Sequence, residues 1–429
     1  MPSPRTVGIG GSLMDQLLKG LAALPGALVA TPVEFFIFGF TLLGVALFHH
    51  RTLTVALSGL TVTLLYKLIF TGFAHGAGVA GLMVHVRHEW VLLGNLMLLL
   101  LGFALLANQF ERSNIPEAMP ALLPDDWKGG LVLLAMVFVL SAFLDNIAAA
   151  IIGGVVAKHV YHNKVSIGFL ASIVAAANAG GAGSVIGDTT TTMMWISGVS
   201  PLAVLPAFIA SAVAFAVFGL LGAWQQQRYS PIQARVAADA PKIDTPRTVI
   251  VGLILVTLLV VNFAGNAWYP EHQDAAPWLG LALWVAVLAT AFIRGPQWSV
   301  LPSAAKGALF LVSLVATASL MPVERLPAAT QQTAMGLGFL SAVFDNIPLT
   351  ALALKQGGYD WGVLAFAVGF GGSMMWFGSS AGVAISNIFP EAKSVWNWLT
   401  KGWFVILAYV IGFMAMYLLL GWHPHPPHH

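Results

Sequence analysis

The chain consists almost entirely of apolar stretches, separated by short gaps that carry most of the charged residues. A helix needs about 20 predominantly apolar residues to cross a bilayer, and tilted or re-entrant segments relax that length. Stretches of about this kind cover residues 33–48, 52–73, 90–108, 129–157, 165–187, 199–224, 248–264, 277–293, 302–321, 332–354, 361–378 and 395–421. The pattern predicts an all-α polytopic membrane protein with about ten to thirteen membrane segments.

Composition excludes several other classes of protein. Charged residues make up 8% of the chain, whereas a soluble domain has about 25%. The net charge is only +2, which gives a nucleic-acid partner no electrostatic support. The chain has no cysteine, which excludes disulfides, thiolate metal sites and cysteine nucleophiles. We therefore expect the lipid bilayer as a partner, no cofactor and no enzymatic activity.

Polar segments divide the chain into regions. The longest polar connection, residues 225–247, contains four basic side chains, and such an excess is typical of cytoplasmic loops. This central loop separates a first membrane repeat over 33–224 from a second over 248–421. Residues 1–32 are predicted to form an N-terminal lead-in or a weak first span, and residues 422–429 a His- and Pro-rich tail.

The N-terminal residues bear on localisation. Asp15 and Lys19 interrupt the first apolar run, so a cleaved signal peptide is not expected. Without a targeting peptide, a bacterial inner membrane is the favoured location. A homodimer is left open.

A sequence motif recurs in the two halves. Ser141–Ile147 reads Ser-Ala-Phe-Leu-Asp-Asn-Ile, and Ser341–Ile347 reads Ser-Ala-Val-Phe-Asp-Asn-Ile. Two-fold internal repeats with broken helices at matching positions indicate a secondary transporter with its site at the repeat interface. A glycine-rich segment follows each motif. Its matched positions are Asn178, Gly180, Gly181 and Gly187 in the first half, and Gly369, Gly371, Gly372 and Gly378 in the second.

The motifs place the pairs Asp145-Asn146 and Asp345-Asn346 midway along apolar segments. A carboxylate at that depth costs at least about 2.5 kcal/mol, which makes it a functional candidate. Asp and Asn are weak helix formers but good caps, and Pro348 suits the first turn of a new helix. We expect each helix to stop before the pair and restart after it, which would leave an oxygen cage suited to Na⁺. The alternative is a capped kink that hydrogen-bonds a neighbouring helix, and the recurrence disfavours it.

Asp188 is the only charged residue in the run 165–227. It lies in the first glycine-rich segment, and the hydroxyl groups of Thr189 and Thr190 after it could bind an ion or cap a half-helix. In the second half, Ser379 and Ser380 replace Asp188 and Thr189, so we expect an asymmetric site. Close helix packing is the alternative role for the glycines.

The sign of the charges separates the substrate classes. Asp145, Asp188 and Asp345 are the charged residues of the motifs, and acids attract cations and protons, whereas an anion carrier presents a cation or several helix N-termini. A carboxylate that must be either protonated or ion-bound couples the two species by competition. We expect Na⁺, or Li⁺, and H⁺ as the transported ions. The expected ion- and proton-binding residues, of which the aspartates would bind Na⁺, are Asp145, Asn146, Asp188, Thr189, Thr190, Asp345, Asn346, Ser379 and Ser380.

These motifs resemble those of the NhaD-type Na⁺/H⁺ antiporters of the ion transporter superfamily. The resemblance rests on Asp-Asn-Ile within a long span, on Gly180–Trp195, on Asp345–Leu349 and on Gly371–Ala384. It implies two inverted-topology repeats with broken helices and re-entrant hairpins, in which the first break and the hairpin of each half form the ion site. Val185 stands where the family's proline is expected.

Two other functions stay open at this point. The same superfamily includes carriers of citrate, dicarboxylates and arsenite, coupled to Na⁺ or H⁺, but the motifs lack the basic residues that an anion would need. An intramembrane aspartyl protease would show Gly-x-Gly-Asp, of which Gly187-Asp188 supplies only the second half. The internal repeat also has no role in a protease.

Two lysines interrupt the apolar pattern. Lys67 lies within the stretch 52–73. It could extend towards the membrane surface, pair with an acid or have a function, and we favour the first, as long basic side chains behave in this way. Lys355 follows the second Asp-Asn segment and is expected at the membrane interface.

Overall fold

The computed structural model describes residues 31–48, 51–74, 76–118, 122–232, 242–269 and 275–425. The predicted lead-in up to residue 30, the middle of the central loop and residues 426–429 of the tail lie outside the described residues. Within these ranges the regular secondary structure is helical, apart from one β-bridge between Phe73 and Gly76. Six of the helices are long and apolar enough to cross a membrane. The prediction of an all-α polytopic membrane protein is therefore confirmed.

The first half begins with two long apolar helices and one shorter one, continues with short helices and ends with a long one. Its helices are α2 (Val33–Leu47), α3 (Thr52–Tyr66) with a π-helical extension η1 (Lys67–Thr71), α4 (Gly78–Glu111), α5 (Ile115–Ala118), α6 (Trp127–Ser141), α7 (Asn146–Val160), α8 (Ile167–Ala182), α9 (Thr189–Ile196), α10 (Pro201–Val204) and α11 (Ala207–Tyr229).

The second half likewise begins with two long apolar helices and one shorter one, continues with short helices and ends with a long one. Its helices are α12 (Thr245–Trp268), α13 (Trp278–Thr290), η4 (Trp298–Val300), α14 (Leu301–Ser319), η5 (Val323–Arg325), α15 (Gln331–Ser341), α16 (Asn346–Gln356), α17 (Trp361–Gly371), η6 (Gly372–Met374), α18 (Ser380–Ile388), η7 (Pro390–Lys393), α19 (Val395–Lys401) and α20 (Trp403–Leu420).

Helix α4 is longer than its apolar stretch predicted. It has 34 residues, which corresponds to about 51 Å at 1.5 Å per residue, whereas the hydrocarbon core is about 30 Å thick. Arg87, His88 and Glu89 interrupt the hydropathy but do not end the helix. The span predicted over 90–108 is therefore only part of a helix that is longer than the hydrocarbon core is thick.

Each Asp-Asn pair marks a helix break. Helix α6 ends at Ser141 and α7 starts at Asn146, while α15 ends at Ser341 and α16 starts at Asn346. The second helix of each pair thus starts at the asparagine rather than after it, because the aspartate takes the N-cap position.

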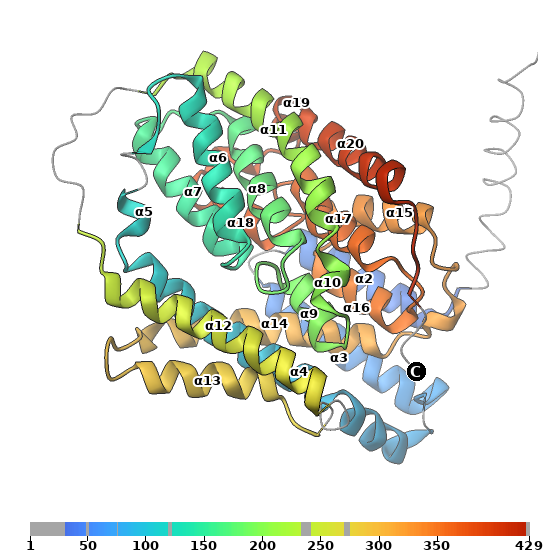
Figure 1. Ribbon diagram of the computed structural model, residues 1–429. Coiled ribbons are helices and arrows are strands. Elements are labelled where there is room, and N and C mark those ends of the chain that lie inside the picture. The colour runs from blue at the N-terminus through green and yellow to red at the C-terminus, as the bar shows by residue number, and fades with distance from the viewer. Residues whose placement is uncertain are drawn as a thin grey trace, which may run out of the picture.

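The described helices fall into two packed groups (Figure 1). In the first, called the flanking group, α2 packs on α3, α3 and α4 on α14, and α4 on α12 and α13. In the second, called the repeat core, α6, α7, α8 and α11 pack together, α20 packs on α11, and α15 on α17. The halves cross inside this core, because α18 packs on α7 and α9 packs on α16. Between the two groups, α14 and α16 make the most extensive contact.

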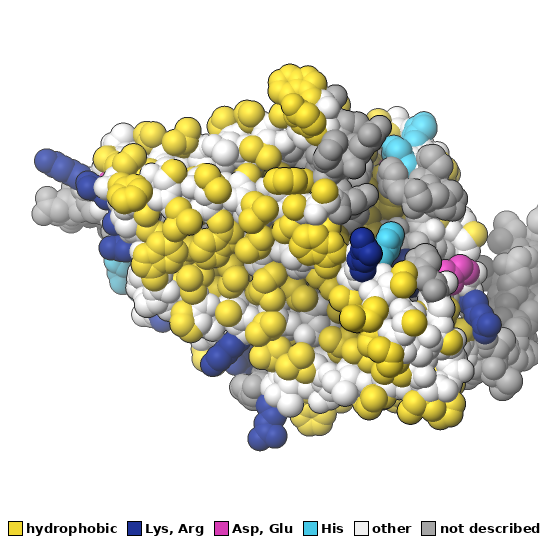
Figure 2. All heavy atoms as spheres, turned by 90° about the horizontal axis from the view of Figure 1, so that it is seen from below, with side chains coloured by type: hydrophobic (Ala, Val, Ile, Leu, Met, Phe, Trp, Pro, Cys, Tyr) yellow, Lys and Arg dark blue, Asp and Glu magenta, His cyan; other side chains and the backbone are white. Residues whose placement is uncertain are grey.

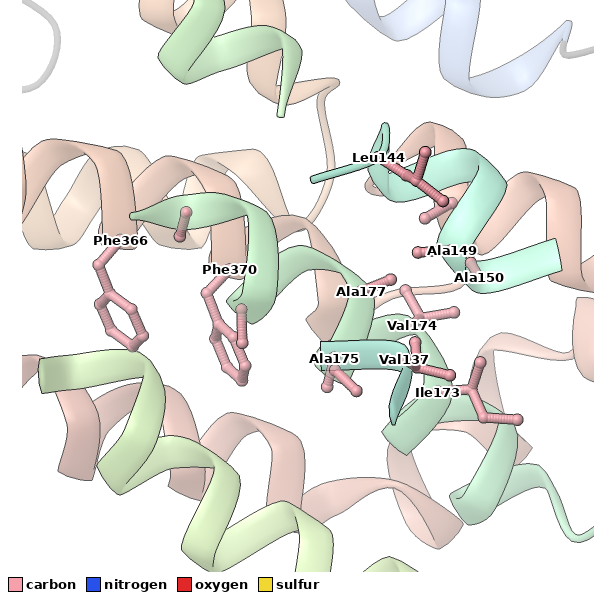
Figure 3. Packing of buried hydrophobic residues seen from close by; sticks show 14 of the residues in the cluster. Val137, Leu144, Ala149, Ala150, Ile173, Val174, Ala175, Ala177, Phe366 and Phe370 are labelled. Carbon is pink, nitrogen blue, oxygen red and sulfur yellow. The ribbon is translucent and has the colours of Figure 1, made fainter. Parts of the chain in front are cut away.

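Small residues allow the helices of the repeat core to approach closely. Helix α8 is buried from Gly168 to Ala182, and it is rich in Ala and Gly, as membrane helix interfaces are. Figure 3 shows side chains of α6, α7 and α8 in contact around Val174. Phe366 and Phe370 of α17 stack with their ring centroids 5.3 Å apart. The core thus holds the helix breaks and hairpins in fixed positions.

The outer surface suits a lipid environment. Seen from below, the molecule presents a broad hydrophobic face with lysines and arginines at its margins (Figure 2). Helix α12 exposes large apolar side chains, among them Leu253, Val256 and Phe263. Such a face is too large for a soluble monomer, which agrees with an integral, multi-pass membrane protein.

Candidate functional site

The two repeated aspartates occupy equivalent positions at the start of half-helices. Asp145 caps α7 with φ −52° and ψ 139°, and Asp345 caps α16 with φ −53° and ψ 140°. Asp345 Oδ1 accepts a hydrogen bond of 3.0 Å from the Ile347 amide, and Ser380 Oγ donates one of 3.4 Å to Oδ2. The fold therefore presents a carboxylate at the positive end of a helix twice.

The turn before α9, which follows α8, and the turn before α18, which follows α17, also match; we call these two segments the hairpins. Asp188 caps α9 with φ −142°, and Ser379 caps α18 with φ −143°. Asp188 Oδ1 accepts a hydrogen bond of 3.1 Å from the Thr190 amide, and Ser379 Oγ accepts one of 3.3 Å from the Gly382 amide. Of these four half-helices, three begin at an aspartate and one at a serine.

The glycines of the two halves are matched in what they contact. A Cβ atom on Gly180 would collide with the carbonyl group of Phe138, and one on Gly371 would collide with that of Gly338. Close backbone packing therefore accounts for these glycines. The other predicted hairpin glycines lie equally close to backbone atoms, and they are Gly181, Gly187, Gly372 and Gly378.

Asn178 joins the two halves at the centre of the repeat core. Its Oδ1 accepts a hydrogen bond of 3.1 Å from Asn146 Nδ2, the amide of the first Asp-Asn pair. Its Nδ2 donates to Ser373 Oγ at 2.9 Å and to Ser379 Oγ at 3.1 Å, both in the second half. Asn146, Asn178 and Ser379 were predicted as site or hairpin residues, and one buried network now connects them.

The second half has Gly369 at the position that corresponds to Asn178, and this exchange makes room for Asp188. A Cβ atom on Gly369 would lie 3.0 Å from Asp188 Oδ2 and 3.8 Å from Thr190 Oγ1. In the matching contact, Asn178 lies against Ser379, whose side chain is shorter than that of aspartate. In one contact the larger residue is Asp188, at the turn, and the smaller is Gly369, in the helix. In the other contact the larger residue is Asn178, in the helix, and the smaller is Ser379, at the turn.

Asp188 is the most enclosed of the three aspartates. Only 2% of its surface is exposed, and the Thr190 hydroxyl, which is buried as well, is the one side-chain donor beside its Oδ2 among the described residues. It also interacts electrostatically with both Asp145 and Asp345. A buried carboxylate with so few donors is unfavourable unless a proton or a cation compensates its charge.

A cavity of about 180 Å³ borders Asp345 and Ser380. Its walls come from both helix groups, with Val45 of α2, Thr52 of α3 and Phe310 of α14 on the flanking side. We call it the Asp345 cavity. It gives Asp345 room for a small ion.

The threonines after Asp188 mainly fix the turn. Thr191 Oγ1 donates to the Ser184 carbonyl at 2.5 Å, and Thr192 Oγ1 donates to the Val185 carbonyl at 2.8 Å. Thr189, predicted as a ligand, is only partly buried at the start of α9. Val185, where the resembled family has proline, is held through its carbonyl group.

The three aspartates do not form one compact cluster. Within the described ranges, no three His, Cys, Asp or Glu side chains lie together as ligands of one metal ion. An ion bound here would therefore combine at most two carboxylates with hydroxyl, amide or carbonyl oxygens. The amide nitrogen of Asn346, the residue after Asp345, is buried and has no hydrogen-bond partner among the described residues.

Serines outside the expected set also hold the site together. Ser141 Oγ donates to the Ala177 carbonyl at 2.5 Å, and Ser341 Oγ donates to the Val368 carbonyl at 2.7 Å. Both serines open the repeated motif, so the repeat itself contained the signal. Ser373, which accepts a hydrogen bond from Asn178, lies in the segment Gly371–Ala384 that resembles the antiporter family, but we did not expect it to contribute to the site.

Comparison with known proteins agrees with these motifs. The chain is 28% identical over 318 residues to sodium/proton antiporter 1 of Arabidopsis thaliana, which covers 65% of this chain and 53% of that protein. It is 26% identical over 355 residues to the Na⁺/H⁺ antiporter NhaD of Vibrio parahaemolyticus, which covers 70% of this chain and 84% of that protein. The chain thus spans about half the length of the Arabidopsis relative.

Among solved structures, the YdaH transporter of Alcanivorax borkumensis aligns with a TM-score of 0.43 and 13% identity, over 88% of this chain and 97% of that one. No protein-family model matches the chain. The repeated motifs and the relatives nevertheless agree with each other. By both, the chain resembles the NhaD-type Na⁺/H⁺ antiporters of the ion transporter superfamily.

Proposed function

We propose that the chain is a secondary active transporter, not an enzyme, and that it exchanges Na⁺ or Li⁺ for protons across a membrane. Its relatives in Arabidopsis and Vibrio are named sodium/proton antiporters. The observation that carries the proposal is the buried pair of Asp188 Oδ2 and Thr190 Oγ1, which lie where the two halves cross and have no other partner in the described chain.

Asp188 can be satisfied in two ways, and they exclude each other. Protonation makes the group neutral and removes most of the cost of burial, while the carboxylate needs a cation beside it. Hard cations take oxygen ligands, and Asp188 Oδ2 and Thr190 Oγ1 both face Gly369. Competition between a proton and a cation for one carboxylate is the coupling that an exchanger requires.

We propose that the ion's route includes two further carboxylates, first Asp345 and then Asp145. Asp345 borders a cavity, so an entering ion can reach it, and Ser380 and Asn346 lie next to it. Asp145 is the matching carboxylate of the first half. Asn146 beside it connects through Asn178 to the second hairpin.

The carrier of an organic anion or arsenite has less support from this geometry. Three of the four half-helix N-termini are capped by an aspartate, which offsets the positive end of each helix. The proposed ion-binding residues include no Lys or Arg. A citrate or dicarboxylate carrier would need such a group to bind its substrate.

The test is proton flux driven by Na⁺, Li⁺ and K⁺ in proteoliposomes. We expect Na⁺ and Li⁺ to drive flux and K⁺ to fail. Asp145→Asn, Asp188→Asn and Asp345→Asn should each abolish the flux, while Asp126→Asn should retain it, because Asp126 is an exposed N-cap at the start of α6. Flux that survives in all three variants would refute the assignment of the aspartates, and flux driven by citrate instead of Na⁺ would favour the anion carrier.

Three related predictions accompany this proposal. We place the protein in a bacterial inner membrane, with the central loop in the cytoplasm, and we expect it to act without a cofactor. A homodimer remains a prediction that the mass of the purified protein in detergent would check.

A further inference from the structure

A second, larger cavity lies at the other end of α16 from Asp345. Its volume is about 470 Å³. Charged and polar side chains line it, and we call it the charged cavity; among them are Glu34, Lys67, His85, Ser319, Glu324 and Lys355. Lys355 is ten residues after Asp345, a distance of about 15 Å along a helix. The charged cavity is therefore separate from the proposed ion site.

The sequence predicted that Lys67 extends to the membrane surface, but the protein encloses its side chain. Only 8% of it is exposed, and its ammonium group lies 5.9 Å from the centre of the Phe73 ring. It borders the charged cavity together with Glu34, which is 4% exposed and accepts a hydrogen bond of 2.9 Å from Thr71. The cavity is thus a polar space built into the protein and not a gap filled by lipid.

The two cavities belong to opposite faces of the membrane. Helix α14 has 19 residues, about 28 Å, which matches the hydrocarbon thickness. Shortly before α14 begins, Arg294 forms an ion pair of 3.3 Å with Asp244 of the central loop. At its far end, Ser319 lines the charged cavity. We name these the central-loop face and the opposite face.

The Asp345 cavity is on the side of the central-loop face. Thr52 and Val45 in its wall lie at the ends of α3 and α2 that are remote from the charged cavity, and Phe310 lies midway along α14. Between the two cavities, buried apolar residues of α2, α14 and α16 fill the contact between the helix groups, among them Phe38, Leu314, Ile347 and Ala351. In this structure Asp345 therefore borders a cavity on the side of the central-loop face and is separated from the charged cavity by packed apolar residues.

Lys355, an exposed residue near the end of α16, joins that helix to α14 on the side of the charged cavity. Its Nζ donates hydrogen bonds of 2.6 Å to the Ser319 carbonyl and 2.5 Å to the Met321 carbonyl, which lie at the C-terminal end of α14. His85 of α4 bonds the Ser319 hydroxyl at 3.1 Å. The last carbonyls of a helix have no partner within it, so water in the cavity could replace the ammonium group at low cost. The ammonium group thus links the end of α16 to the end of α14 through two hydrogen bonds.

We propose that the charged cavity is the closed entrance to Asp345 from the opposite face, and that Lys355 is the latch that keeps it closed. The proposal rests on the transport function above but not on the identity of the ion. Release of the latch lets α16 separate from α14, which connects Asp345 with the charged cavity.

The absence of cysteine makes a direct test available. We place a single cysteine at Val383, which lines the Asp345 cavity, and label it with a membrane-impermeant thiol reagent from either side. A separate cysteine at the exposed Tyr229, on the last turn before the central loop, identifies the two sides. With the latch intact, Val383→Cys should react from the central-loop face and be protected from the opposite face.

Lys355→Met in this background should raise the labelling rate from the opposite face at least about tenfold, since two charge-assisted hydrogen bonds are lost. Lys355→Arg keeps the donors and should preserve protection. Lys306→Met removes an exposed lysine from α14 and is the matched control. All variants are compared at equal yield and equal elution from gel filtration.

Three outcomes would overturn the proposal. They are labelling from both faces before the latch is changed, an unchanged ratio of rates in Lys355→Met, and an equal rise from both faces, which would indicate a loosened fold. Labelling does not depend on exchange activity. A missing Na⁺-driven flux together with the expected labelling would therefore refute the function and leave the latch in place.

Discussion

Gly369→Ala is the substitution that tests the site most directly. The added methyl group would lie 3.0 Å from Asp188 Oδ2, closer than a relaxed carbon–oxygen contact. Asp188 must then move by a few tenths of an ångström, although Oδ1 is fixed by its hydrogen bond to the Thr190 amide. The methyl group also covers the oxygen that is proposed to receive the ion.

The size of the effect follows from the interaction that is lost. A contact with a charged group contributes about 1.5–3 kcal/mol, so the apparent Na⁺ affinity should fall about 10- to 150-fold. Replacement of glycine by alanine inside a helix gains up to about 1 kcal/mol, which offsets the strain. We therefore expect exchange to weaken strongly while the melting temperature changes little.

The assay is Na⁺-driven proton flux in proteoliposomes over a range of Na⁺ concentrations, together with thermal unfolding in detergent. Gly336→Ala in α15 is the control, because a Cβ atom there meets nothing within 4 Å. The double variant Asp188→Ser with Gly369→Asn copies the Asn178–Ser379 contact, and it should fold but not exchange ions. An unchanged Na⁺ affinity in Gly369→Ala, or exchange by the double variant, would refute the reasoning.

Two further predictions concern stability. Asn178→Ala should lower the melting temperature, because it removes three buried hydrogen bonds, at about 1–3 kcal/mol for each group left unsatisfied. Ser211→Ala removes a buried hydroxyl without a partner in the described chain and should leave the melting temperature unchanged. An equal fall in melting temperature in the two variants would contradict this prediction. Although desolvation acts to raise the pKa of Asp244, hydrogen bonds and charge from two neighbouring arginines lower it below its usual range. The contribution of Asp244 to stability is therefore present at neutral pH and lost as the pH falls through that lowered pKa. Asp244→Asn should lower the melting temperature at pH 7 but not in acid. The control Asp126→Asn should not show this difference between the two pH values.

The helix breaks could be predicted because the information for them is local. An aspartate that caps, an asparagine, and in one half a proline after it act within one turn of helix, and the repeat supplied a second copy of the evidence. The same holds for the capping by Asp188 and Ser379. Exact boundaries shifted by a few residues, since the capping residue and not the whole pair determines where the helix starts.

The contacts between the halves could not be predicted in the same way. Spacing along the chain aligns Asn178 with Gly369 and Asp188 with Ser379, but it does not show that the hairpins cross and pair these positions diagonally. The reciprocal exchange of larger and smaller residues was visible in the sequence, yet its meaning requires the crossing. Lys67 was misjudged for a related reason, because hydropathy cannot distinguish a helix side that faces lipid from one that faces a polar cavity.

The diagonal pairing of the hairpins has a consequence for biosynthesis. Ser379, which accepts one hydrogen bond from Asn178, is translated 201 residues later, and Gly369, which makes room for Asp188, is also in the late half. The first repeat is therefore inserted into the membrane with a buried amide and a buried acid that lack their final surroundings. Domains translated first usually fold first, whereas here the early half completes its interior only when the late half docks. A ribosome that stalls in the central loop would leave a membrane-inserted half that quality control can recognise by its unmatched polar groups.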